Sequence, residues 1–74
     1  MPKLARLPAK KVVKKLKRAG FMERHQRGSH LYLVNEDGSK IVTVPMHGAD
    51  IPIGTLHAIV VHQAGLTIEQ FNAL

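Results

Sequence analysis

The sequence predicts a small α+β domain in which helices cover one face of a three-stranded antiparallel sheet. Apolar residues recur at helical spacing up to Gly20, and the pattern then changes to the alternation typical of strands. Two glycine-containing turns divide this alternating stretch into three strands, and helical spacing returns afterwards. The 74 residues suit one domain, placed at residues 1–74, near the lower size limit for a chain with its own core.

The segment LPAKKVVKKLKRAGF predicts a helix with clear ends. Pro8 suits the first helical turn, and Gly20 suits a left-handed stop after which Phe21 folds back as an apolar contact. At 100° per residue, five apolar residues fall within an arc of about 120°. They are Ala9, Val12, Val13, Leu16 and Ala19. The opposite side carries Lys10, Lys11, Lys14, Lys15, Lys17 and Arg18.

The next segments predict strands joined by tight turns. A short strand is expected over residues 21–25, followed by a turn in which Gly28 supplies a positive φ. The second and third strands are expected over residues 29–34 and 40–45, joined by a two-residue turn at Asp37-Gly38. That turn sets the register, because it pairs Val34 with Ile41, Tyr32 with Thr43, and His30 with Pro45.

The predicted register divides the sheet into an apolar face and a polar face. The apolar face, expected to meet the core, consists of Leu31, Leu33, Val42 and Val44. The other face carries His30, Tyr32 and Thr43, and His47 joins them if the third strand continues. His30 is therefore expected on a rigid backbone with its side chain accessible, which suits chemistry and also suits an ordinary solvent-facing residue.

The C-terminal third predicts two helices after a loop over residues 47–54. Thr55 is expected to cap the first helix, and Gly65 is expected to end it. The apolar side of that helix consists of Leu56, Ile59, Val60 and Gln63. Thr67 and Gln70 have the spacing of a capping box for a last short helix, whose apolar stripe is formed by Phe71 and Leu74.

Positive charge is concentrated at the N-terminal end of the chain. Ten of the eleven Lys and Arg residues lie between Lys3 and Arg27, so the first 27 residues carry +9 and the last 47 carry −3. Such asymmetry attracts polyanions, of which nucleic acid is the commonest. A lysine-rich helix face can also serve solubility alone, but a solubilising face could have included glutamates, which this helix lacks.

Composition excludes several classes of protein and site. Without cysteine there is no disulfide and no thiolate metal site. No apolar run approaches the roughly 18 residues of a membrane span, so a soluble, cytoplasmic protein is expected. We expect neither a metal nor a cofactor, since His57 and His62 are five apart, off the one-face spacing of an HExxH pair, and lack a carboxylate cluster. With three aromatic residues, stacking on several bases is not expected as the main mode of binding.

The order and spacing of GF, RGSH, DG, VPMHG, GTLHAI, QAGLT and EQF resemble the HicA family of mRNA-cleaving toxins, from about residue 13 to residue 74. The resemblance implies a fold similar to double-stranded RNA-binding domains, endoribonuclease activity, and a partner antitoxin, HicB. It also implies that the strand histidine is catalytic. In this sequence that role falls on His30, which follows Arg27, Gly28 and Ser29.

Metal-independent RNA cleavage needs one group to take the 2′-hydroxyl proton and another to protonate the leaving 5′-oxygen. An imidazole can play either role near neutral pH, so His30 is the candidate general base or acid. His47 and Tyr32 are the candidates for the other role. The candidate RNA-binding residues are Lys10, Lys11, Lys14, Arg18, Arg27, Gly28 and Ser29. The remaining histidines are interpreted as surface residues: His25, His57 and His62.

Two alternative functions stay open at this level. The chain could be an RNA-binding module of the same fold that grips RNA through its basic helix and does no chemistry. It could also be a subunit whose charged helix docks on an acidic protein. A nuclease assay with EDTA separates the first alternative from the toxin, and the salt dependence of binding separates the second.

Overall fold

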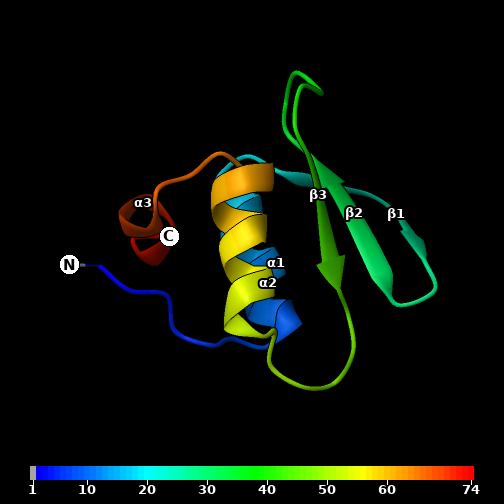
Figure 1. Cartoon of the computed structure of the whole chain (residues 1–74). Helices are drawn as coiled ribbons and strands as arrows, with labels where there is room; N and C mark the ends of the chain where they lie inside the picture. Colours follow the sequence, from blue (N-terminus) through cyan, green and yellow to red (C-terminus); the bar gives the residue numbers. More distant parts are fainter. Residues whose placement is uncertain (1) are drawn as a thin grey trace.

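The computed structural model describes residues 2–74 and has the predicted α+β order (Figure 1). The elements are α1 (Ala9–Arg18), β1 (Met22–Arg27), β2 (His30–Val34), β3 (Ile41–Pro45), α2 (Ile53–His57), the π-helical η1 (Ala58–Gln63) and α3 (Ile68–Asn72). Figure 1 shows the sheet on one side of the molecule and the helices on the other. Within residues 2–74, no helix is long and apolar enough to cross a membrane.

The three strands form an antiparallel sheet in the order β1-β2-β3. The predicted register is confirmed, because Val34 lies opposite Ile41, and His30 lies opposite Pro45. The predicted two-residue turn is wrong. The Gly38 N–H donates to the Asn35 carbonyl and the Asn35 N–H donates to the Lys40 carbonyl, so the loop is longer. The predicted two-residue turn and the observed longer loop are both centred between Asp37 and Gly38. The predicted pairing of β2 with β3 is therefore kept.

Helix α1 ends as predicted and begins one residue later than predicted. Pro8 has extended backbone angles (φ −65°, ψ 150°) and precedes the first turn, where its carbonyl accepts N–H groups of residues 11 and 12. At the other end Gly20 has φ 99°, which favours glycine. The Phe21 N–H then donates to the Leu16 carbonyl over 3.0 Å, and the Phe21 ring is buried.

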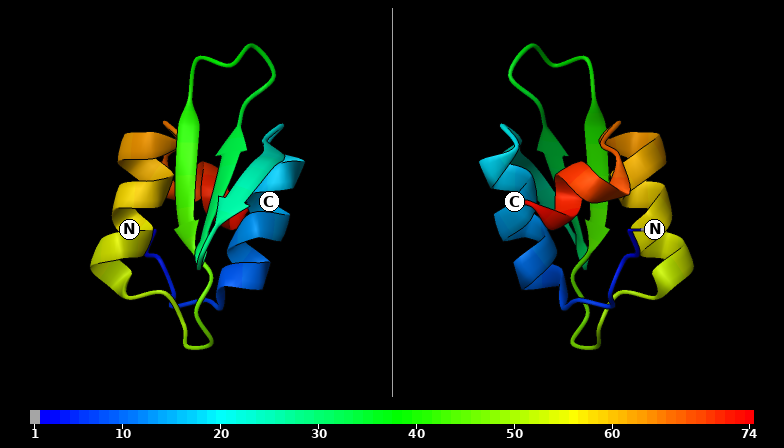
Figure 2. Two further views of the ribbon diagram at one scale, coloured as in Figure 1. Left: turned by 90° about the vertical axis from the view of Figure 1, so that its right-hand side faces the viewer. Right: turned by 90° about the vertical axis from the view of Figure 1, so that its left-hand side faces the viewer.

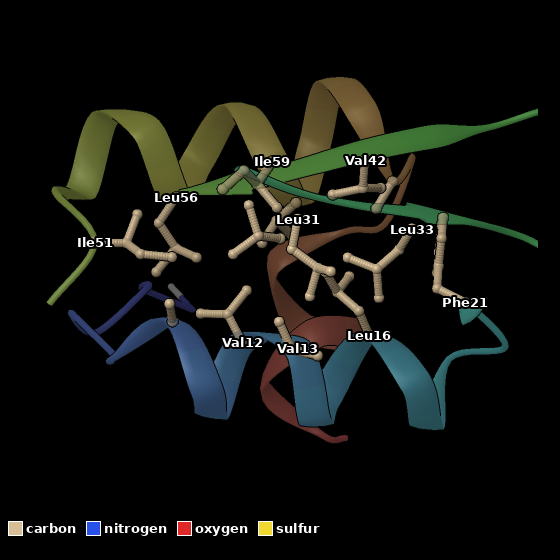
Figure 3. Packing of buried hydrophobic residues seen from close by; sticks show 14 of the residues in the cluster. Val12, Val13, Leu16, Phe21, Leu31, Leu33, Val42, Ile51, Leu56 and Ile59 are labelled. Carbon is tan, nitrogen blue, oxygen red and sulfur yellow. The ribbon is translucent and has the colours of Figure 1, made fainter. Parts of the chain in front are cut away.

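The core lies between the inner face of the sheet and the helices (Figure 3). The predicted apolar sheet face is confirmed as its floor: Leu31, Leu33, Val42 and Val44 are all buried. Helix α1 contributes Val12 and Leu16, both fully buried. Among the described residues no polar or charged residue is buried. All candidate chemistry therefore lies on the surface.

The helix after the loop differs from its prediction in two ways. It begins at Ile53, and Thr55 makes no capping hydrogen bond because it already lies inside the first turn of α2. The helix then widens into η1, which keeps Ile59, Val60 and Ala64 buried together. Gln63 was predicted on the apolar side, and its Oε1 accepts the Thr43 N–H over 2.8 Å, joining η1 to the edge of β3.

The short helix α3 crosses the helical side of the molecule, away from the sheet (right view of Figure 2). Its predicted capping box is confirmed: the Gln70 N–H donates to Thr67 Oγ1, and Gln70 Oε1 accepts the Thr67 N–H. Phe71 is buried. Lys15 of α1 donates to the carbonyls of Phe71 and Leu74, at 3.3 Å each. The ammonium group of Lys15 therefore holds α3 against α1.

Candidate active site and nucleic-acid interface

The candidate catalytic residue, His30, stands at one corner of the uncovered face of the sheet. It is the first residue of β2, it is exposed, and its cross-strand partner is Arg27. The turn between them needs Gly28, whose φ is 58°. In the left view of Figure 2 this outer face is turned to the viewer, and none of the described helices lies over it. The ring is thus rigidly presented and open to solvent.

His47 lies beside His30, although the predicted reason for this was only partly right. Strand β3 ends at Pro45, two residues before His47. The chain nevertheless stays next to the turn, because the Met46 N–H donates to the Ser29 carbonyl. The two imidazole rings are 6.3 Å apart between centroids and nearly perpendicular, at 87°. Both histidines are exposed, so a substrate group can reach both.

Tyr32 occupies a different environment from His47. It is half-buried and stacks on His25 of β1, with 4.7 Å between ring centroids and 17° between ring planes. Two residues along a strand correspond to about 7 Å, so the stacked pair lies on the same face as His30 and farther along β2. Its arrangement is that of an aromatic platform. His25 is exposed, as predicted.

The cations of α1 do not form one uniform surface. Lys10 and His47 line a common hollow, of about 320 Å³, at the end of the molecule where α1 begins. Lys11 and Lys14 are exposed on the side of α1 that faces away from the sheet. Arg18 is exposed at the other end of α1, about 12 Å from Lys10 along the helix axis. Of the candidate RNA-binding residues, those near His30 are therefore Arg27, Gly28 and Ser29 at the turn, and Lys10 through the hollow it shares with His47.

Two further lysines of α1 have partners within the protein. Lys17 forms an ion pair with Glu23 of β1. Lys15 holds the carbonyls at the end of α3, and its ammonium lies 5.1 Å from the centroid of the Phe71 ring. Of six cations on the helix, four are thus without such contacts in the described residues: Lys10, Lys11, Lys14 and Arg18.

The spacing argument against a site at His57 and His62 is corrected by the structure. Residues five apart do not share a face of an α-helix, but they do approach when the helix widens into η1. The two rings are 5.7 Å apart between centroids. In residues 2–74, however, no group of three or more His, Cys, Asp or Glu side chains is arranged to hold a metal ion. The pair stays a two-residue contact.

Sequence reasoning missed Arg24. Strand β1 has an irregularity between Glu23 and His25, where the register against β2 shifts by one residue. Arg24 is the extra residue, and it lines a hollow on the sheet together with His25 and Tyr32. No signal in the sequence marks this bulge, because it needs neither glycine nor proline.

Within residues 2–74, the carboxyl group with a clearly shifted pKa is Asp37, in the β2–β3 loop. The Ser39 hydroxyl and the Ser39 N–H both donate to the Asp37 carboxylate and lower the pKa of this exposed group below its ordinary value. These hydrogen bonds hold Asp37 to Ser39 within the loop that joins β2 to β3.

The chain was compared with known proteins. A family model described as the HicA toxin of bacterial toxin-antitoxin systems matches residues 9–66 of the 74-residue chain. The match includes His30, His47, the sheet and both ends of α1. No curated protein matches the chain.

Proposed function

This chain belongs to the HicA toxin family of bacterial toxin–antitoxin systems, and from that premise we propose that it is an mRNA-cleaving endoribonuclease with His30 as catalytic residue. A toxin of such a pair has an antitoxin as its partner. The observation that carries the proposal is the presence of two exposed imidazoles with ring centroids 6.3 Å apart, one at a corner of the sheet and one just after β3. Arg27 adds a cation directly across from His30.

The proposed step is an internal transfer at phosphorus. One imidazole takes the proton of a ribose 2′-hydroxyl as its oxygen attacks the adjacent phosphorus, and the P–O5′ bond breaks. The other imidazole gives a proton to the leaving 5′-oxygen. The products carry a 2′,3′-cyclic phosphate and a 5′-hydroxyl, and the step consumes no water. Arg27 meets the negative charge that develops on the phosphoryl oxygens.

His47 suits the second proton transfer better than Tyr32 does. A phosphate at this corner can contact both rings, since their centroids are 6.3 Å apart and both side chains are exposed. Tyr32 is stacked on His25 and lies about two residues along the strand. The proposal therefore assigns the two proton transfers to His30 and His47.

The cations guide the RNA backbone to this corner. Lys10 shares a hollow with His47, so an RNA strand passing between α1 and the β1–β2 turn meets a positive side chain next to the reacting phosphate. Lys11, Lys14 and Arg18 extend the positive surface along α1. The backbone of Gly28 and Ser29 at the turn can approach a phosphate closely, since neither residue carries a large side chain.

The proposed partner is a HicB-type antitoxin, and the proposed location is the cytoplasm, where mRNA is found. An antitoxin that neutralises this toxin covers His30 or presents acidic groups to the cations. RNA and antitoxin are then expected to exclude each other. Binding of both at full affinity would contradict this part of the proposal.

The decisive experiment compares the native chain with His30→Ala in a nuclease assay that contains EDTA. The native chain is expected to cut mRNA with the metal removed, and the variant is expected to lose about 10²- to 10⁴-fold in rate. Circular dichroism checks that the variant is folded, which the exposure of His30 leads us to expect. A native chain that shifts RNA in a gel and leaves it intact would instead be a binding module without catalysis.

A further inference from the structure

The outer face of the sheet has a hollow beyond His30, toward the tip of the β2–β3 hairpin. Its volume is about 450 Å³, and it is lined by Arg24, His25, Tyr32, Val34, Gly38 and Ile41. We propose that this hollow, the base pocket, binds one unpaired nucleobase of the RNA whose phosphate lies at His30. The inference rests on the proposed function and adds to it a site that selects single-stranded RNA.

The bulge in β1 builds the polar rim of the base pocket. In a regular strand Arg24 and His25 would point to opposite faces of the sheet. Because Arg24 is the extra residue where the register shifts, both side chains line the same hollow. The guanidinium can donate to a base or a phosphate, and the imidazole has a ring face and nitrogen atoms.

Stacking is the main attraction that the base pocket offers. The rings of His25 and Tyr32 are nearly parallel, at 17°, and are held together by cross-strand pairing. A base can continue this stack as a third ring, in the way that aromatic side chains bind unpaired bases. Val34 and Ile41 pair across β2 and β3 and supply an apolar floor, of which Ile41 is 58% exposed. An exposed isoleucine beside a tyrosine gains from being covered by a flat ring.

The position of the base pocket relative to His30 fits a nucleotide. His30 and Tyr32 lie on the same face of β2, about 7 Å apart along the strand. A nucleotide whose phosphate is at His30 can therefore place its own base, or that of its neighbour, over Tyr32. A paired base in a helix cannot reach the sheet in this way, because its faces are covered by its neighbours in the stack.

Charge favours RNA over an apolar segment of a protein as the occupant. The open side of the sheet near the base pocket carries Arg24 and Arg27 as well as His25 and His30. An apolar protein segment would gain nothing from the two arginines. RNA brings the phosphates that they need, and a single base needs only one stacking platform. That agrees with a chain that has three aromatic residues.

The test is a double-mutant cycle of binding between the protein and the RNA. The protein is the full chain with His30→Ala, so that the RNA stays intact, with or without Tyr32→Leu. The probe is a fluorescein-labelled short single-stranded RNA, compared with RNAs that lack one base at a time. Affinity is measured by fluorescence anisotropy. Tyr32→Leu on the intact RNA is expected to lose roughly 5- to 150-fold in affinity.

The coupling decides the result. One abasic position is expected to lose about as much affinity as Tyr32→Leu does, and the two changes together are expected to lose little more than either alone. Losses that multiply at every position overturn the base pocket. A Tyr32→Leu protein that binds RNA with unchanged affinity also overturns the base pocket. If that protein has instead lost affinity for the antitoxin, the hollow is a contact site for a protein partner.

Two isoleucines offer a matched control, and phenylalanine separates the ring from the hydroxyl. Ile41→Thr is expected to weaken RNA binding, whereas Ile53→Thr, at an exposed isoleucine on α2, is expected to leave it unchanged. Tyr32→Phe should restore the affinity that Tyr32→Leu loses. Because the cycle measures binding, its outcome does not depend on cleavage. If Tyr32→Leu and one abasic position are coupled but the native chain does not cleave RNA, only the catalytic proposal is contradicted. If the native chain cleaves RNA but the two changes are not coupled, only the base pocket is contradicted.

Discussion

At the scale of single residues, the proposed site consists of imidazoles that come from separate parts of the chain. His30 begins β2, whereas His47 follows β3, and a backbone hydrogen bond from Met46 to Ser29 keeps them together. The sequence placed His30 on the accessible face of a strand after the Gly28-Ser29 turn, and its catalytic role was what the resemblance to the HicA family implied. The sequence left His47 and Tyr32 as equal candidates, and our proposal of His47 rests on the tertiary contacts of the two side chains, including the stacking of Tyr32 on His25.

His47→Ala is expected to reduce the rate of RNA cleavage by about 10²- to 10⁴-fold, because the second proton transfer loses its group. Kinetics on a defined RNA oligonucleotide measure this effect. The pH profile of the native chain is expected to be bell-shaped, and the variant is expected to lose one limb of the bell. His62→Ala is the matched control, since His62 is an exposed histidine of η1 outside the site. Equal rates for the native chain and His47→Ala would assign the second role elsewhere.

Asp37 gives a prediction about pH that is independent of catalysis. Hydrogen bonds from the Ser39 hydroxyl and N–H lower its pKa below the ordinary 3.8. Their contribution to stability is therefore complete above that value and is lost as the pH falls through the lowered pKa. NMR titration of the Asp37 carboxyl carbon is expected to give a midpoint below 3.8, and Ser39→Ala is expected to raise it. A midpoint at or above the ordinary value would contradict the loop structure.

At the scale of elements, helix ends show how far local rules extend. The capping box at Thr67 was predicted and is present, because both hydrogen bonds form within one turn of chain. Thr55 was predicted as a cap and is not one. Pro52 has extended backbone angles and ends the loop, so the helix begins at Ile53. Thr55 therefore lies inside the helix, where its hydroxyl accepts no hydrogen bond from a free N–H group.

The two threonines therefore form a matched pair for measuring a cap. Thr67→Ala is expected to lower the free energy of unfolding by about 0.5–2 kcal/mol, since one N–H of α3 loses its acceptor. Thr55→Ala is expected to change stability little, because its side chain is exposed and caps nothing. Urea denaturation followed by circular dichroism measures both. A larger loss for Thr55→Ala would contradict the observed start of α2.

At the scale of the whole molecule, the cations of α1 and the candidate histidines occupy different sides and come closest at one end. Figure 2 shows that no described helix lies over the outer face of the sheet. Helix α1 buries its apolar residues against the core, so its exposed cations point away from the sheet. Lys10 shares a hollow with Met46 and His47, and the Met46 N–H donates to the Ser29 carbonyl of the β1–β2 turn, so the two sides come together here. An RNA that reaches His30 can therefore contact α1 only by passing around that end of the molecule.

The salt dependence of RNA binding tests which lysines contact the backbone. In the His30→Ala protein, Lys14→Gln is expected to reduce the slope of log affinity against log salt by about 0.7, the value for one phosphate of a single strand. Lys15→Gln is expected to leave the slope unchanged, because Lys15 is held by the carbonyls of Phe71 and Leu74. Anisotropy titrations over a range of salt concentrations measure both slopes. Equal losses would show that Lys15 is free to contact RNA.

The sequence by itself determined the element order, the register between β2 and β3, the apolar face of the sheet and the place of His30. These follow from periodicity and turn residues, which are local properties of the chain. Only the tertiary structure decided that His47 lies beside His30, that Lys15 is occupied by α3, and that Arg24 joins His25 in one hollow. The physical reason is that each of these depends on packing between elements or on a bulge. Neither leaves a periodic trace in the order of the amino acids.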